Sequence, residues 1–211
     1  MAGIQEVYDL TVKGSAKKIG DAVQAALDAG CDPAAILNEG MIKAMDVVGE
    51  KFKNGEVFVP EMLVAARAMK KGVEILKPHL ASGATGALGK VIIGTVAGDM
   101  HDIGKNLVAM MLESAGFEVI DLGVDTPVAK FIDTVKANPD TKIVCCSALL
   151  TTTLGALRET VAALNELPQR ANFKVMIGGA PVTQELADEV KADAYTEDAG
   201  SCAQRAKEIV A

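Results

Sequence analysis

The sequence predicts an α/β protein in which a four-helix bundle precedes a five-stranded parallel sheet of flavodoxin-like order. Three observations indicate this: the first 80 residues show only helical patterns, residues 81–89 hold three glycines and no charge, and beyond them apolar runs alternate with helical stripes. Such alternation is typical of a doubly wound sheet. We expect a helical domain over 1–80, a flexible linker over 81–89 and a sheet domain over 90–211.

The N-terminal part is expected to form four helices with short connections. Apolar residues at three- and four-residue spacing mark the first two helices before residue 30. Asp32 is a suitable N-cap for the third helix, with Pro33 at its first position, and Asn54-Gly55 ends it. The fourth helix begins at Pro60.

The sheet domain contains five strand–helix units. Strands read as short apolar runs and helices as amphipathic stripes. In chain order we expect strands over 90–97, 117–122, 142–147, 173–178 and 193–196, and helices over 103–115, 127–137, 152–166, 182–191 and 198–210.

Composition narrows the partners and the compartment. With 21 basic and 28 acidic residues, the net charge of −7 argues against nucleic acid as a partner. No C-x-x-C pair occurs among the four cysteines, which we interpret as small buried residues in a reducing compartment. No signal peptide is apparent, and no apolar run reaches the roughly 18 residues that span a bilayer. We expect a cytoplasmic protein that does not contact membranes.

The loop after the first strand holds a candidate metal ligand. It consists of Asp99, Met100, His101, Asp102, Ile103 and Gly104. In an open α/β sheet such a loop lies at the carboxyl edge, where ligands bind. His101 offers an imidazole nitrogen to a metal, and Asp99 could accept the other ring N–H and so fix the tautomer. Ser147 could extend this relay. His79, the other histidine, more simply serves as a surface residue at a helix end.

Two further loops are expected to converge on the same place. The loop after the third strand starts at Ser147, and the loop after the fourth contains Gly178 and Gly179, which would let a large ligand approach the backbone. Because one histidine is the only obvious ligand, we infer that a metal arrives inside a macrocycle that already fills the equatorial positions.

These residues resemble a known family. Asp99-x-His101-x-x-Gly104, then Ser147-x-Leu149, then Gly178-Gly179 is similar to the cobalamin-binding domain of corrinoid proteins and of B12-dependent methionine synthase. The stretch 57–62 before an Ala-rich helix resembles the helical cap domain of corrinoid methyltransferase systems, and residues 192–199 resemble the family's closing strand and helix. The resemblance covers essentially the whole chain.

The resemblance implies roles for individual residues. His101 would be the lower axial ligand of cobalt, Asp99 and Ser147 would support it, and Gly104 would leave room for the corrin. Residues implied to line the groove for the nucleotide tail are Ser147, Leu149, Thr151, Gly178 and Gly179. In the bundle, Met62, Ala66 and Met69 could face the upper side of the corrin.

The resemblance also implies a function. The chain would be a methyl-carrying corrinoid subunit, not a complete enzyme alone, which shuttles a methyl group on cobalt to tetrahydrofolate or a thiol. Its partners would be a donor-specific methyltransferase, an acceptor methyltransferase and a reductive activase. Aryl methyl ethers, methylamines, methanol and betaines are open as donors; from the chain's compact length we favour an aryl methyl ether O-demethylase system.

Two alternatives share the fold. A B12-binding sensor or photoreceptor normally carries a DNA-binding or signalling module, for which this sequence shows no basic recognition helix. A small subunit of an adenosylcobalamin mutase rarely needs a helical cap of about eighty residues. Light sensitivity and methyl transfer would separate these possibilities.

Overall fold

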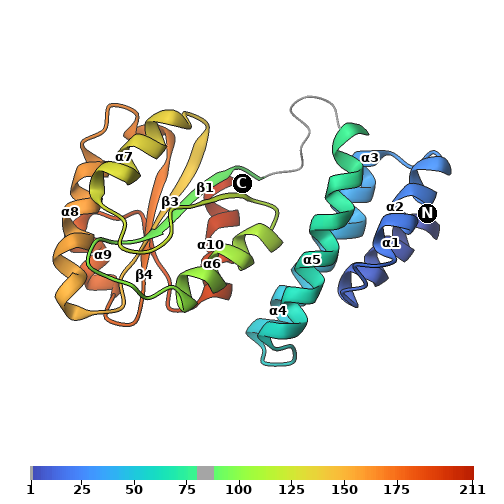
Figure 1. Cartoon of the computed structure of the whole chain (residues 1–211), viewed down its shortest axis with the longest axis horizontal. Helices are drawn as coiled ribbons and strands as arrows, with labels where there is room; N and C mark the ends of the chain where they lie inside the picture. Colours follow the sequence, from blue (N-terminus) through green and yellow to red (C-terminus); the bar gives the residue numbers. More distant parts are fainter. Residues whose placement is uncertain (1, 80–87) are drawn as a thin grey trace. The chain divides into compact units, whose positions relative to one another are not determined.

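The computed structural model describes residues 2–79 and 88–211, and these form two compact units, one helical and one that contains the sheet (Figure 1). The linker expected over 81–89 falls mostly outside the described residues, so the domain boundaries stay a prediction. None of the helices within 2–79 and 88–211 is long and apolar enough to cross a membrane.

The helical unit has the four predicted helical segments, the third of which is not uniform. Its elements are α1 (Ala2–Val12), α2 (Ile19–Asp28), α3 (Pro33–Ala35), the π-helical η1 (Ile36–Ile42), α4 (Lys43–Lys53), α5 (Val59–Leu76) and the short η2 (Lys77–His79). Asp32 is the N-cap of α3, since its carboxylate accepts the N–H of Ala35 at 3.1 Å. In the wider π turn, Gly40 lies against Val7 of α1, where an added Cβ would meet the Val7 side chain at 3.0 Å.

The second unit is a five-stranded parallel sheet with strand order β2-β1-β3-β4-β5, which is the predicted flavodoxin-like order. Its elements are β1 (Lys90–Thr95), α6 (Ile103–Ser114), β2 (Glu118–Asp121), α7 (Val128–Ala137), β3 (Thr141–Ser147), η3 (Thr151–Thr153), α8 (Leu154–Asn165), η4 (Arg170–Asn172), β4 (Lys174–Gly178), α9 (Gln184–Val190), β5 (Ala194–Tyr195) and α10 (Ala199–Val210). Each expected strand and helix is present, with bounds that shift by one or two residues.

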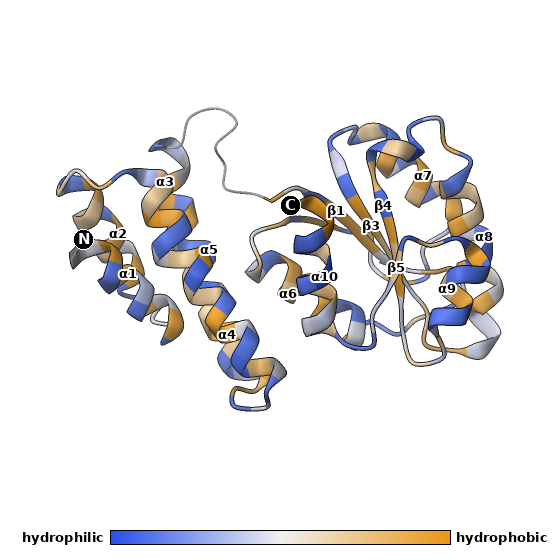
Figure 2. Ribbon diagram, turned by 180° about the vertical axis from the view of Figure 1, so that it is seen from behind, coloured by the Kyte–Doolittle hydropathy of each residue, from blue (hydrophilic) through white to orange (hydrophobic). Residues whose placement is uncertain are grey.

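Helices cover both faces of the sheet (Figures 1 and 2). Alternate residues of the central strands, such as Ile92, Val144 and Val175, pack with Phe131 of α7 and Leu157 of α8 in one buried cluster. The opposite face of the sheet is covered by α6 and α10 (Figures 1 and 2). Because neighbouring strand residues point to opposite faces, both faces must be apolar, and the central strands are apolar almost throughout. The sheet thus presents only its edges and its loops to ligands.

Candidate functional site

The loops after β1, β3 and β4 meet at the carboxyl edge of the sheet. The N–H of Leu149 donates to Asp99 Oδ2 at 2.7 Å, which joins the first two loops. The N–H of Ala148 donates to the carbonyl of Gly178 at 3.1 Å, which joins the second and third. The loops therefore come together as the strand order predicts.

Asp99 is the buried centre of this arrangement, with none of its surface exposed. Its Oδ1 accepts the backbone N–H of His101 at 3.1 Å and is 2.7 Å from the ring Nδ1. Its Oδ2 accepts the N–H groups of Leu149 and Leu150, at 2.7 and 3.3 Å, and the hydroxyl of Thr153 at 2.9 Å. Burial raises the pKa of this carboxyl, but the hydrogen bonds, above all that from Leu149, bring the pKa well below its usual value. Asp99 is therefore a carboxylate at neutral pH.

His101 is oriented by that carboxylate. A carboxylate only accepts hydrogen bonds, so Nδ1 must donate, and in the neutral ring Nε2 then keeps its lone pair. The backbone of His101 is held as well, because its carbonyl accepts the hydroxyl of the fully buried Thr95 at 2.9 Å. The imidazole side chain is 48% exposed. The site thus presents one fixed nitrogen ligand to solvent.

The two loops that Asp99 joins also carry exposed apolar side chains. Met100 and Ile103 are 69% and 83% exposed, and Leu149 and Leu150 are 41% and 40% exposed. An added Cβ at Gly104 would meet no atom within 4 Å, so the turn leaves open space there. Across residues 2–79 and 88–211, no group of three or more His, Cys, Asp or Glu side chains could hold a bare ion. These features fit a metal that brings its own flat, largely apolar ligand.

The relay predicted through Ser147 needs a correction. Within the described structure, the hydroxyl that donates to Asp99 belongs to Thr153, not to Ser147. Ser147 is the last residue of β3 and lies level with Thr95 in the ladder, whereas Asp99 comes four residues after Thr95, beyond the end of β1. The chain after β3 turns into η3, and this brings Thr153 to the carboxylate.

The two glycines at the end of β4, Gly178 and Gly179, have different surroundings. An added Cβ at Gly178 would make an ordinary contact of 3.7 Å with the carbonyl oxygen of Thr196. At Gly179, where φ is +125°, it would lie 1.8 Å from the carbonyl oxygen of Ala148. Gly179 is thus required by the packing of the loops themselves, a reason that the sequence pattern did not reveal.

The methionines proposed for the helical unit lie in its core. Met62 is 1% exposed, Met69 is 6% exposed and Ala66 is half-buried. The exposed apolar side chains near the start of α5 belong instead to Phe58, Val59, Leu63 and Val64, with exposures of 67%, 36%, 36% and 44%. Helical spacing identifies the buried face of α5. The large apolar residues that do not fall on this face could have indicated the exposed apolar surface.

Sequence reasoning also missed the polar contacts that connect the loop of His101 to the end of β2 and to the loop after it. Asp125 donates its N–H to the carbonyl of Asp99 at 2.9 Å and accepts the N–H of Gly98 at 2.7 Å. Its φ of 48° lies in the left-handed region, which aspartate tolerates better than most residues. Lys105, in the first turn of α6, is 3% exposed and contacts Asp121 at 2.5 Å.

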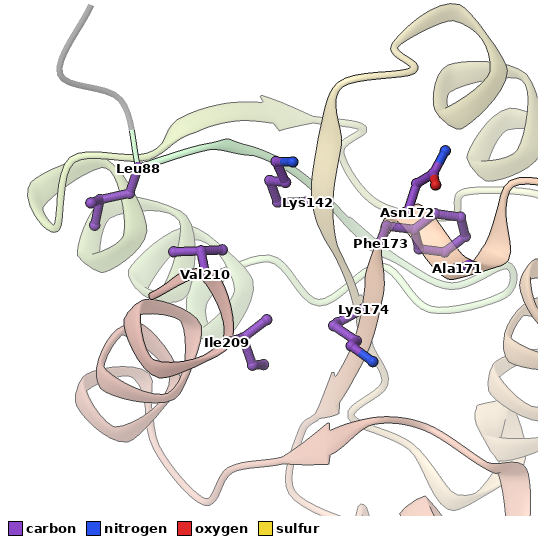
Figure 3. A pocket seen from close by; sticks show the side chains of 8 residues that line it. All are labelled: Leu88, Lys142, Ala171, Asn172, Phe173, Lys174, Ile209 and Val210. Carbon is purple, nitrogen blue, oxygen red and sulfur yellow. The ribbon is translucent and has the colours of Figure 1, made fainter. Parts of the chain in front are cut away.

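Figure 3 shows a recess elsewhere on this unit. It has a volume of about 260 Å³ and is lined by residues that include Lys142, Lys174, Phe173 and Val210. Because Lys142 and Lys174 stand at the beginnings of β3 and β4, the recess lies at the amino edge of the sheet. It contains none of the predicted site residues.

Comparisons with known families match both units. Residues 89–202 match a B12 binding domain, and residues 4–77 match a second family model that is also described as a B12 binding domain. Together these two matches cover most of the chain.

Similar proteins share almost the whole length. The chain is 42% identical over 207 residues to dimethylamine corrinoid protein 3 of Methanosarcina acetivorans, covering 98% of this chain and 96% of the relative. It is 44% identical over 184 residues to the trimethylamine corrinoid protein of Methanosarcina barkeri, covering 86% and 84%. A chain in the crystal structure of the methanol:cobalamin methyltransferase complex of Methanosarcina barkeri matches with a TM-score of 0.86 and 30% identity, covering 99% of this chain and 80% of that one.

Proposed function

This chain belongs to the corrinoid proteins of methyltransferase systems, and from that premise we propose that it is the methyl-carrying component of a methylamine methyltransferase system. Its cofactor is cobalamin or a related corrinoid. The observation that supports a carrier most directly is the half-exposed ring of His101, fixed at Nδ1 by a buried carboxylate. The donor class is supported by relatives whose names include dimethylamine and trimethylamine. The comparisons do not support the aryl methyl ether that chain length favoured.

The bound corrinoid would supply a cobalt centre that takes up and releases the methyl group. In this proposal, Nε2 of His101 would hold the cobalt of the bound corrinoid. Asp99 keeps the proton at Nδ1 and so fixes the tautomer that leaves the lone pair of Nε2 free. The same hydrogen bond makes Nε2 more basic and therefore a stronger metal ligand. Thr153 and the N–H groups of Leu149 and Leu150 hold Asp99 in turn. The chain therefore fixes one ligand and its proton before the cofactor binds.

The loop residues would give the cofactor an apolar, water-excluding surface. Met100 and Ile103 are exposed beside His101 in sequence, and Gly104 leaves open space at the turn. The proposed contacts for the nucleotide tail remain Ser147, Leu149, Thr151, Gly178 and Gly179. For the helical unit, we propose that its exposed apolar side chains near Phe58 contact the corrinoid in place of the buried Met62 and Met69.

The partners follow from the carrier role. A donor-specific methyltransferase would bring the methylamine, as the structural match to a component of a methyltransferase complex suggests. A second methyltransferase would pass the methyl group to a thiol or to tetrahydrofolate, and a reductive activase would restore the reduced cofactor.

One experiment tests both ligand and donor. The chain has two histidines, so protein labelled with ¹⁵N-histidine, loaded with hydroxocobalamin and reduced to the cob(II) form should show electron paramagnetic resonance splitting from a ¹⁵N axial nitrogen. The splitting should disappear in His101→Ala and persist in the matched control His79→Gln. A second portion of the loaded protein is reduced further, to the cob(I) form that can accept a methyl cation, and is then incubated with a dimethylamine-specific methyltransferase plus dimethylamine, or with a methanol-specific methyltransferase plus methanol.

We expect methylation of the cofactor with dimethylamine and little with methanol. Labelled splitting that survives in His101→Ala would overturn axial ligation by this residue. Methylation with methanol alone would overturn the methylamine assignment, and no methylation by either pair would overturn the carrier role.

A further inference from the structure

Lys105 is a buried cation that the role of His101 does not explain. It is 3% exposed, whereas lysine is almost never fully buried unless it is paired. It also stands in the first turn of α6, where the positive end of the helix dipole disfavours a cation. A buried charge at such a place is costly, so its partners indicate what it holds together.

Those partners connect the end of β2 to the loop that carries His101. The Lys105 ammonium donates to Asp121 at 2.5 Å and to the side-chain oxygen of Asn106 at 2.6 Å. The amide of Asn106 donates in turn to the carboxylate of Asp102 at 3.1 Å. Asp102 is the residue directly after His101. A chain of polar contacts thus runs from the β2 edge to the neighbour of the proposed ligand.

Residues 121–125, at the end of β2 and the start of the next loop, also hold the beginning of the loop that carries His101. Asp121 also accepts the N–H of Gly123 at 2.8 Å, which fixes the start of the β2–α7 loop. Two residues later, Asp125 bonds the N–H of Gly98 and the carbonyl of Asp99, as described above. The loop of residues 98–105 is therefore attached to the β2–α7 loop before His101 and to the last residue of β2 after it.

We propose that Lys105 is a positioning residue, which clamps the loop of residues 98–105 to the end of β2 and thereby keeps the His101 imidazole in place to bind the cobalt. This inference rests on the proposed function for the ligand role of His101. The clamp itself concerns only residues of the chain and can be measured without cofactor. The polar partners of Lys105 in the described structure are Asn106 and Asp121, not the imidazole or Asp99, so its effect passes through the backbone of the loop.

The test compares Lys105→Met with Lys90→Met. Methionine keeps the length of the side chain and removes the charge. Lys90 is the matched control, since its side chain is 15% exposed and pairs with Asp140 at 3.0 Å at the opposite edge of the same sheet. Asp121→Asn provides a second variant that breaks the same pair, in case Lys105→Met does not fold.

Two readouts follow the position of His101. In cofactor-free protein labelled with ¹⁵N-histidine, the Nδ1–H proton of His101 should exchange with water about tenfold faster in Lys105→Met, and at the wild-type rate in Lys90→Met. In the loaded cob(II) protein, the histidine nitrogen splitting should weaken, and hydroxocobalamin should bind about tenfold less tightly, as for other changes in residues that orient a metal ligand.

The outcomes separate the two proposals. If Lys105→Met lowers the melting temperature but leaves proton exchange, splitting and affinity as in the wild type, Lys105 is merely structural and the positioning role is overturned. If the wild type shows no histidine splitting while Lys105→Met speeds exchange, the clamp stands and the ligand role of His101 fails. Equal effects in Lys90→Met would show that any lost ion pair suffices, and would also overturn the proposal.

Discussion

At the scale of single residues, Asp99 organises the site because its two oxygens serve different loops. Oδ1 faces its own loop and holds both the backbone and the ring of His101. Oδ2 faces the loop after β3 and accepts Leu149, Leu150 and Thr153. One buried carboxylate thus fixes the tautomer of the proposed ligand and joins the two loops. The hydrogen bonds of Asp99 therefore both stabilise the fold and orient the His101 imidazole.

The cysteines of β3 allow a prediction at the same scale. Burial raises the pKa of the Cys146 thiol to about 12, from an ordinary value of 9.0. Because the folded pKa is the higher one, the unfolded chain loses this proton first, and stability that is complete below pH 9 decreases as pH rises toward 12. For this thiol the loss at pH 10 is about 1.4 kcal/mol of unfolding free energy.

Urea unfolding at pH 8 and pH 10 measures this loss. Cys146→Ala should lose about 1.4 kcal/mol less than the wild type between the two pH values. Val144→Ala shortens a buried neighbour on β3 without removing an ionisable group, so it should lose as much as the wild type. Equal losses in the wild type and Cys146→Ala would contradict the raised pKa.

At the scale of elements, the loops at the carboxyl edge are held by backbone as much as by side chains. The loop after β3 donates the N–H of Ala148 to Gly178, and the loop after β2 donates that of Asp125 to Asp99. Close approach between the loops requires a glycine at position 179, whereas an added Cβ at Gly98 or Gly123 would have room, and only the positive φ favours glycine there. The parallel strands bring the loops to one edge, and these contacts lock them there.

Gly179 and Gly178 form a matched pair for testing this packing. In Gly179→Ala the new Cβ would lie 1.8 Å from the Ala148 carbonyl oxygen, at a φ that disfavours alanine. We expect a loss of at least about 2 kcal/mol in unfolding free energy. Gly178→Ala should change it by about 0.5 kcal/mol or less, because its Cβ has room. Urea titration of both variants decides the matter; similar midpoints would refute the close approach.

At the scale of the whole molecule, each unit carries exposed apolar side chains that a protein seldom leaves in water. In the sheet unit they include Met100 and Ile103, and in the helical unit they include Phe58 and Leu63. Exposed apolar groups of this kind mark binding surfaces. Since both units match B12 binding domains, we expect both surfaces to be covered when the corrinoid binds.

Phe58→Ser tests the helical unit's share. Because Phe58 is 67% exposed, the change should alter the unfolding free energy by less than about 0.5 kcal/mol. Loss of a buried contact in the complex should weaken hydroxocobalamin binding by about tenfold, which equals roughly 1.4 kcal/mol. Leu88→Ser, a change of an exposed apolar residue beside the recess in Figure 3, serves as the control and should bind as the wild type does. Wild-type affinity in Phe58→Ser would rule out this surface.

The sequence by itself determined the fold, the element order and the pairing of Asp99 with His101. Hydrophobic periodicity is a local property, so it places strands and helices before any tertiary contact is known. A two-residue spacing is local as well, and it brought the carboxylate within 2.7 Å of the ring. The convergence of three loops followed from the strand order, which has few alternatives in a doubly wound sheet.

Only the tertiary structure decided which residues support the site from a distance. Thr153 replaces Ser147 at Asp99 because of the path that the chain takes after β3. Lys105 pairs with Asp121 because α6 packs beside the end of β2, and periodicity alone cannot show that a lysine is buried. Helical spacing placed Met62 on the apolar face of its helix, but it did not show that Phe58 just before the helix is exposed. Such contacts join residues far apart in the chain, and their geometry depends on how the loops and layers pack.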